Sequence, residues 1–324
     1  MRVLTSDTLK DFLQQAGGQY RVLAPVVYTD GTVALGGLDE GPVDFLSGQL
    51  SGKTTAAFFP PEETLFSFEA GAVRPVLGPG KPLLVLGLSA ADADALEFID
   101  RFYANQFKDV TYLQRRANSV VAVVSGKVNG GFERIAGKNC DLEFTFDGTK
   151  FFVSAYTARG EALAGLVKDQ TADVAGFDAM KRQSLVLGHE TKAILDHASK
   201  LICDGKVTDD FWKTIADSCI ECGSCVYSCP TCTCFDVYDV GTADCGVRKR
   251  CWDTCVLGGY TREASGHNPR NEAERSRRRV SHKLAADVQR WGHISCMACG
   301  RCDSNCPTGI GILAVSRKIV EKFN

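Results

Sequence analysis

Hydrophobic residues in the first half of the chain predict strands and helices that follow one another. Residues 82–88 form a short apolar run of the length of a buried strand, and Ser89 with Asp92 has the spacing of a helix-capping pair. Apolar residues at 96, 98, 99 and 102 then recur with helical spacing, and residues 119–124 form a second strand of the buried type. Together these segments predict a βαβ unit.

Two other segments of this half alternate between apolar and polar residues, which is typical of half-buried strands. Residues 141–155 form one such segment around an Asp147-Gly148 pair, and residues 21–35 form another around Asp30-Gly31. Because Asp-Gly pairs favour tight turns between antiparallel strands, we expect two β-hairpins.

From Gly188 onward the pattern becomes helical and more polar. Residues 190–202 and 209–218 carry apolar residues at helical spacing, and residues 272–291 also favour a helix. We therefore expect an α+β protein with two domains. Residues 1–185 would form an α/β domain that docks a partner, and residues 186–324 a mainly helical, ferredoxin-like domain.

The cysteines separate these two parts of the chain. Of the 15 cysteines, only Cys140 and Cys203 precede residue 219. Most of the others fall in two runs of identical spacing, Cys219-x2-Cys222-x2-Cys225-x3-Cys229-Pro230 and Cys296-x2-Cys299-x2-Cys302-x3-Cys306-Pro307. Runs of this type bind [4Fe-4S] clusters, and in two-cluster proteins the fourth cysteine of each run ligates the other cluster. The spacing predicts two [4Fe-4S] clusters, the first held by Cys219, Cys222, Cys225 and Cys306, and the second by Cys296, Cys299, Cys302 and Cys229.

Zinc and disulfides are the alternative interpretations of so many thiols. Structural zinc takes four ligands from pairs of Cys-x2-Cys units, whereas each run here has an additional cysteine and ends in Cys-Pro. A disulfide framework is typical of secreted proteins, and residues 1–7 lack the basic and apolar segments of a secretion signal. Both alternatives are therefore less favoured than iron–sulfur clusters.

Length and charge limit the remaining classes of function. With 324 residues, the chain is long enough for two domains that each bury a core. Its formal net charge of -2 gives no electrostatic argument for binding nucleic acid or an anionic membrane surface. The apolar run at 82–88 is far shorter than the ~20 residues that a membrane span needs. We therefore expect a cytoplasmic protein with no nucleic-acid partner and no membrane span.

No catalytic constellation accompanies the cysteines. The five histidines form no H-E-x-x-H pattern. Residues 48–54 resemble a phosphate-binding loop but are one residue short between their glycines, and Gly78-Pro79-Gly80 precedes a strand instead of joining a strand to a helix. We therefore expect no catalytic residue and no cofactor beyond the clusters.

Further motifs lie around the two runs. They are residues 229–236, 252–255, 266–270, 277–283 and 299–302, with looser stretches at 21–26, 58–62 and 95–116. In these motifs the chain resembles the beta subunits of soluble [NiFe] sulfhydrogenases and is similar to the A subunits of anaerobic sulfite reductases. It departs at residues 88–92, where the family often has Arg-Pro-Cys-Asp, so any role of that family cysteine is absent here.

The resemblance implies an electron-transfer subunit of a multisubunit oxidoreductase. Such subunits relay electrons between a flavin subunit that handles NAD(P)H and a terminal catalytic subunit of hydrogenase, sulfite reductase or heterodisulfide reductase type. Two functions of other classes stay open. One is a catalytic subunit with its own flavin or substrate site in the N-terminal domain, and the other is a structural metal module without a redox role.

Five surplus cysteines lie between the runs, at 232, 234, 245, 251 and 255. A buried cysteine behaves as a small apolar residue, so packing is their simplest role. A third cluster or a zinc ion is the alternative, with Cys232, Cys234 and Cys255 as the possible extra thiols.

A basic segment precedes the second run. Residues 270–283 carry six cationic side chains against Glu272 and Glu274. They could pair with acidic neighbours along a helix. Alternatively, they could cover the clusters, whose thiolate ligands make them negatively charged and whose reduction cations favour.

Overall fold

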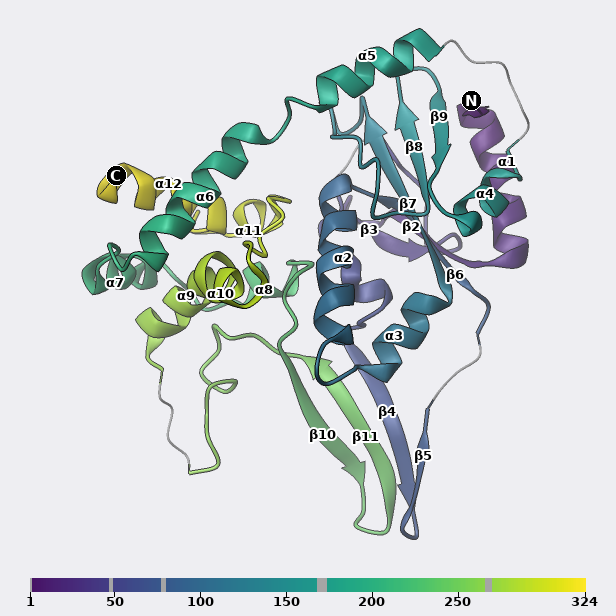
Figure 1. Ribbon diagram of the computed structural model, residues 1–324. Coiled ribbons are helices and arrows are strands. Elements are labelled where there is room, and N and C mark those ends of the chain that lie inside the picture. The colour runs from purple at the N-terminus through teal and green to yellow at the C-terminus, as the bar shows by residue number, and fades with distance from the viewer. Residues whose placement is uncertain (1, 47–48, 77–79, 168–173, 266–269) are drawn as a thin grey trace. The chain divides into compact units, whose positions relative to one another are not determined.

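The computed structural model describes residues 2–46, 49–76, 80–167, 174–265 and 270–324 (Figure 1). Gly48, Gly78, Pro79 and residues 266–269, which belong to motifs considered above, lie outside the described residues. The chain divides into two compact units. Unit 1 comprises Met1–Phe59 and Gly78–Leu187, and unit 2 comprises Pro60–Leu77 and Gly188–Asn324.

Unit 1 is built on a seven-stranded sheet with the order β1-β9-β8-β7-β6-β2-β3. Its strands are β1 (Arg2–Leu4), β2 (Arg21–Val27), β3 (Val33–Gly37), β6 (Leu83–Leu88), β7 (Ser119–Gly126), β8 (Leu142–Phe146) and β9 (Phe151–Ala155). The four strands β2, β6, β7 and β8 are mutually parallel, whereas β3 and β9 run antiparallel to their neighbours. Parallel strands need crossover connections, and the one from β6 to β7 runs through two helices, at Ala90–Ala104 and Val110–Ala117.

Helices pack on both faces of this sheet (Figure 1). They are α1 (Ser6–Gln19), α2 (Ala90–Ala104), α3 (Val110–Ala117), α4 (Ala158–Ala164) and α5 (Val174–Ser184), with a short 3₁₀ turn at Thr54–Ala57. Phe12 of α1 and Leu163 of α4 share a core with Val120 and Ala122 of β7. Because side chains alternate along a strand, Val121 faces the opposite side, where α2 lies.

The predicted βαβ unit and both hairpins are confirmed. The chain passes from β6 through α2 to the parallel strand β7, although α3 adds a second helix to the connection. Ser89 caps α2 as expected, because its hydroxyl accepts from the Asp92 N–H while the Asp92 carboxylate accepts from the Ser89 N–H. In the β8–β9 hairpin, Asp147 Oδ1 accepts from the Lys150 N–H at 2.9 Å and closes the turn.

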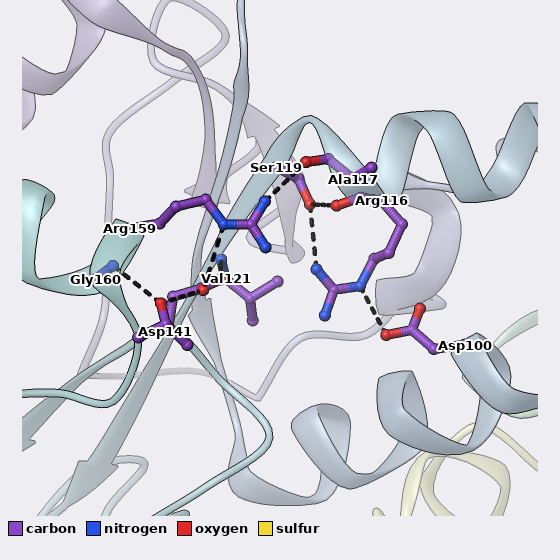
Figure 2. A network of polar contacts seen from close by, with 9 residues as sticks. Asp100, Arg116, Ala117, Ser119, Val121, Asp141, Arg159 and Gly160 are labelled. Carbon is purple, nitrogen blue, oxygen red and sulfur yellow. Dashed lines mark hydrogen bonds and ion pairs between the residues drawn. The ribbon is translucent and has the colours of Figure 1, made fainter.

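A polar network fastens the amino ends of β7 and β8 to the adjacent helices (Figure 2). Arg116 of α3 donates to Asp100 of α2 at 3.0 Å, and Arg159 lies 3.8 Å from the buried Asp141. Asp141 also accepts from the Val121 N–H at 2.9 Å. Ligands of open α/β sheets bind at the carboxyl ends of the strands. The position of this network, and the pairing of both guanidinium groups with carboxylates, favour a role in stabilising the fold.

Unit 2 contains a four-stranded antiparallel sheet with the order β10-β11-β4-β5. The strands are β4 (Glu62–Glu69), β5 (Ala72–Pro75), β10 (Phe235–Gly241) and β11 (Cys245–Trp252). A buried ion pair joins β11 to β4, in which Arg250 Nε donates to Glu63 Oε1 at 2.9 Å. This sheet was not predicted. Two of its strands, β10 and β11, lie between the cysteine runs, and nearly every residue of β10 is exposed, so no regular alternation of buried and exposed residues marks it as a strand.

Helices form the rest of unit 2. They are α6 (His189–Cys203), α7 (Asp209–Asp217), α8 (Ser224–Tyr227), α9 (Glu272–Ser281), α10 (Asp287–Trp291), α11 (Arg301–Ser304) and α12 (Ile312–Phe323), with a π-helical turn at His282–Ala286 between α9 and α10. Leu195 of α6, Trp212 of α7 and Ile319 of α12 belong to one core, and Cys219 and Cys296 pack against it. Both cysteine runs are thus anchored on a helical core. Among the described helices, none is long and apolar enough to cross a membrane.

Candidate metal centres

The two cysteine runs fold in the same way. In the first run the backbone adopts positive φ at Glu221 (52°) and Gly223 (74°), and in the second at Ala298 (54°) and Gly300 (79°). A one-turn helix follows in each case, α8 or α11, and carries the third cysteine of the run. Left-handed residues at matching positions curl each loop back on itself, which lets three closely spaced thiols face one point.

The fourth cysteine of each run makes the same contact with a threonine hydroxyl. Cys229 Sγ lies 3.4 Å from Thr231 Oγ1, and Cys306 Sγ lies 3.5 Å from Thr308 Oγ1. The trailing prolines served to identify the runs, whereas these hydroxyls were missed. The signal was present, because both runs end in Cys-Pro-Thr. A hydroxyl at this distance can donate to the sulfur and stabilise a thiolate.

One cavity, which we call site 1, joins the first three cysteines of the first run to the last cysteine of the second. It is lined by Cys219, Cys222, Cys225 and Cys306 together with Arg279 of α9. A second cavity, site 2, has the reciprocal composition. It is lined by Cys229, Cys296, Cys299 and Cys302 together with Lys283 of the π-helical turn. These are the two groups of four that the crossed pattern predicted, although ligation itself stays a prediction.

Arg279 is the cation of site 1. Its side chain is buried, and its Nη2 donates to the Ile310 carbonyl at 2.6 Å. Within the part of the chain that the structure describes, its buried Nη1 has no hydrogen-bond partner. A buried donor without a partner is costly. A negatively charged cluster among the four thiolates of site 1 would supply both the missing acceptor and the countercharge, so the residues present fit such a group.

Lys283 is the cation of site 2. Its Nζ donates to Thr231 Oγ1 at 2.5 Å, and that hydroxyl contacts Cys229. Burial alone disfavours the charged amine, but the sulfurs of Cys229, Cys232 and Cys296 hold the pKa of Lys283 well above its usual value. Of the two roles considered for the basic segment, the structure favours contact with the cluster sites for Arg279 and Lys283. Another cation of this segment, Arg277, pairs with Asp209 at the surface.

Three of the thiols that line the cavities resist ionisation when no metal balances their charge. Burial raises the pKa of Cys225, raises that of Cys296 to about 12, and raises that of Cys302. Because iron binds the thiolate, cluster assembly would displace these protons. Two backbone donors then favour the charged sulfurs, since the Ile310 N–H lies 3.4 Å from Cys306 Sγ and the Ile312 N–H lies 3.5 Å from Cys302 Sγ.

The surplus thiols do not form one group. Cys232 hydrogen-bonds to Cys229 beside site 2. Cys234 hydrogen-bonds to Cys255 and to the Tyr260 hydroxyl. Cys245 and Cys251 lie on β11.

In the described ranges, no group of three or more His, Cys, Asp or Glu side chains is arranged to hold a single metal ion. A single zinc ion needs its ligands within about 2.3 Å, whereas each thiolate of a cubane binds a different iron.

The comparisons with known proteins agree with this geometry. Residues 218–310 match the family model of the 4Fe-4S dicluster domain. The whole chain is similar to sulfhydrogenase 2 subunit beta of Pyrococcus furiosus, with 27% identity over 336 positions that cover 98% of each protein. No solved structure matches the chain. The predicted similarity to anaerobic sulfite reductase stays a prediction. The resemblance to a sulfhydrogenase beta subunit is confirmed over nearly the full length of the chain, and its C-terminal part contains a 4Fe-4S dicluster domain.

Proposed function

We propose that this chain is an electron-transfer subunit of a hydrogenase-type complex in the cytoplasm. It would relay electrons between a flavin subunit that handles NAD(P)H and a terminal catalytic subunit. The observation that carries the proposal is the pair of cavities, each lined by four cysteines and one buried cation. When bound, a [4Fe-4S] cluster in each cavity would accept and release one electron.

The cysteines of the two cavities would ligate the clusters, and one cation in each cavity would offset charge. Cys219, Cys222, Cys225 and Cys306 would ligate the cluster of site 1, and Cys229, Cys296, Cys299 and Cys302 that of site 2. Arg279 and Lys283 would offset part of the negative charge in their cavities. Each run supplies ligands to both sites, so the two clusters would be tied to one another through the protein.

The sites differ in their access to solvent. Cys222 of site 1 is exposed and is flanked by Ile220, which is 63% exposed, whereas Cys302 of site 2 is buried. An exposed cluster ligand beside an exposed apolar residue favours exchange of electrons with a docked protein at site 1. We therefore assign contact with a redox partner to the loop at residues 219–225.

The cofactor content tests the metal assignment. We expect about eight iron and eight sulfide per chain after anaerobic reconstitution, with broad visible absorption that bleaches on reduction by dithionite. Metal analysis and absorption spectroscopy measure both quantities. Four iron or fewer per chain, or zinc without visible absorption, would contradict two cubane clusters.

If the chain is an electron relay, NAD(P)H should reduce its clusters only through the flavin subunit. The chain offers no dinucleotide fingerprint, so we expect NAD(P)H to leave the clusters of the isolated chain oxidised and to reduce them once the flavin subunit is added. Anaerobic stopped-flow absorption measures the rate of bleaching. Rapid bleaching in a sample shown to contain no other subunit would favour a catalytic subunit with its own flavin site.

A further inference from the structure

Two of the surplus thiols form a pair next to site 1. Cys234 precedes β10 and Cys255 follows β11, and the pairing of these strands brings their ends together, since the Asp253 N–H donates to the Cys234 carbonyl at 3.0 Å. The side chains of Cys234 and Cys255 are in hydrogen-bonding contact. Cys255 belongs to a small buried cluster with Val226 and Val256, and Cys234 packs against that cluster.

The two thiols differ in access and in their neighbours. Cys255 is 6% exposed, whereas Cys234 is partly exposed and also contacts the hydroxyl of Tyr260. Arg278 contributes a positive charge near Cys255 and Tyr260. An accessible thiol in contact with a buried thiol suits thiol–disulfide exchange, because the accessible sulfur can attack a disulfide and the second sulfur can resolve the mixed disulfide.

We propose that Cys234 and Cys255 form a redox-active dithiol that exchanges with small organic disulfides. The Cys234 sulfur attacks one sulfur of the disulfide, a mixed disulfide forms, and the first thiol leaves with a proton. The Cys255 sulfur then attacks Cys234 and releases the second thiol with its proton. One S–S bond has moved onto the chain, and two electrons and two protons have moved to the small molecule.

This site adds two-electron chemistry to a chain whose proposed clusters each carry one electron. Cys255 packs near Cys225 of site 1, so the dithiol lies against one cluster site within unit 2. The exchange reaction itself needs no cluster. Its test can therefore fail while the proposed function stands, and iron analysis of the same sample separates the two.

Glutathione is the probe for this site. The reconstituted full chain is equilibrated anaerobically in buffers of reduced and oxidised glutathione, its thiols are trapped by alkylation, and its peptides are mapped by mass spectrometry. We expect a Cys234–Cys255 linkage in the oxidising buffers, at least tenfold more abundant than any other cysteine pair, and its loss in the reducing buffers. Iron should remain at about eight per chain throughout.

Matched variants identify the sulfurs. Cys234→Ser and Cys255→Ser should each abolish the linkage, whereas Cys232→Ser and Cys251→Ser should retain it, although each removes a thiol close in sequence to the proposed pair. Three outcomes would overturn the proposal. They are free thiols at both positions in every buffer with iron retained, a linkage that survives Cys255→Ser, and a loss of iron in Cys234→Ser or Cys255→Ser, which would make these residues metal ligands.

Discussion

Replacing Cys306 by alanine is expected to remove the cluster of site 1, although the other three cysteines of that site lie about eighty residues earlier in the chain. The reason is that Cys306 lines the cavity of Cys219, Cys222 and Cys225 instead of the cavity of its own run. Iron content should fall from about eight to about four per chain, with one set of signals left in the electron paramagnetic resonance spectrum of the reduced protein.

Double substitutions identify which cluster is lost. If Cys306 and Cys219 serve the same cluster, Cys219→Ala in the Cys306→Ala background removes no further iron, because that cluster is already absent. Cys296→Ala in the same background should remove the remaining iron. Cys245→Ala is the control, since Cys245 lies on β11 and lines neither cavity. The opposite pattern, in which Cys296→Ala adds nothing to Cys306→Ala, would show that each run holds its own cluster.

Local patterns predicted the elements that depend on neighbouring residues. The run at 82–88, the cap at Ser89 and the turn at Asp147-Gly148 specify their conformations through contacts within a few residues, and all three are present in the structure. The grouping of the cysteines into two cavities follows the expected pattern, because in two-cluster proteins the fourth cysteine of each run ligates the other cluster. Ligation itself stays a prediction.

Long-range pairing was not predictable in the same way. Strand β4 pairs with β11 although almost two hundred residues separate Glu62 from Cys251, its partner in the register. No local pattern specifies such a partner, and β4 alternates only weakly between buried and exposed residues. The pairing depends on contacts that exist only in the folded chain, among them the buried ion pair of Glu63 with Arg250.

For a similar reason, the sequence did not show which cations of the basic segment line the cysteine cavities. The basic segment at 270–283 was recognised from composition, but its six cations look equivalent in the sequence. The four-residue spacing of Arg279 and Lys283 places them on one helix face. Only the folded unit shows that this face meets both cysteine cavities, while Arg277 on the same helix faces Asp209 at the surface.

Replacing Lys283 by methionine is expected to make the cluster of site 2 harder to reduce. Reduction adds negative charge to a cluster that is already anionic, and a buried cation stabilises the reduced state more than the oxidised state. Without it, we expect the equilibrium constant for reduction to fall at least tenfold, which corresponds to about 59 mV for a one-electron couple. Methionine keeps a comparable side-chain length and the apolar packing, so the four cysteines should still hold iron.

Arg279→Met tests the same argument at the other site. It should lower the potential of the cluster of site 1 more than that of site 2, because Arg279 lines the cavity of site 1 and not that of site 2. Its buried Nη1 also has no hydrogen-bond partner among the described residues. Arg277→Met is the matched control, since it removes a cation from the same helix that pairs with Asp209 at the surface. Potentiometric titration followed by electron paramagnetic resonance measures each potential. Equal shifts in all three variants would show that overall charge, and not the position of Lys283 and Arg279 in the cavities, sets the potentials.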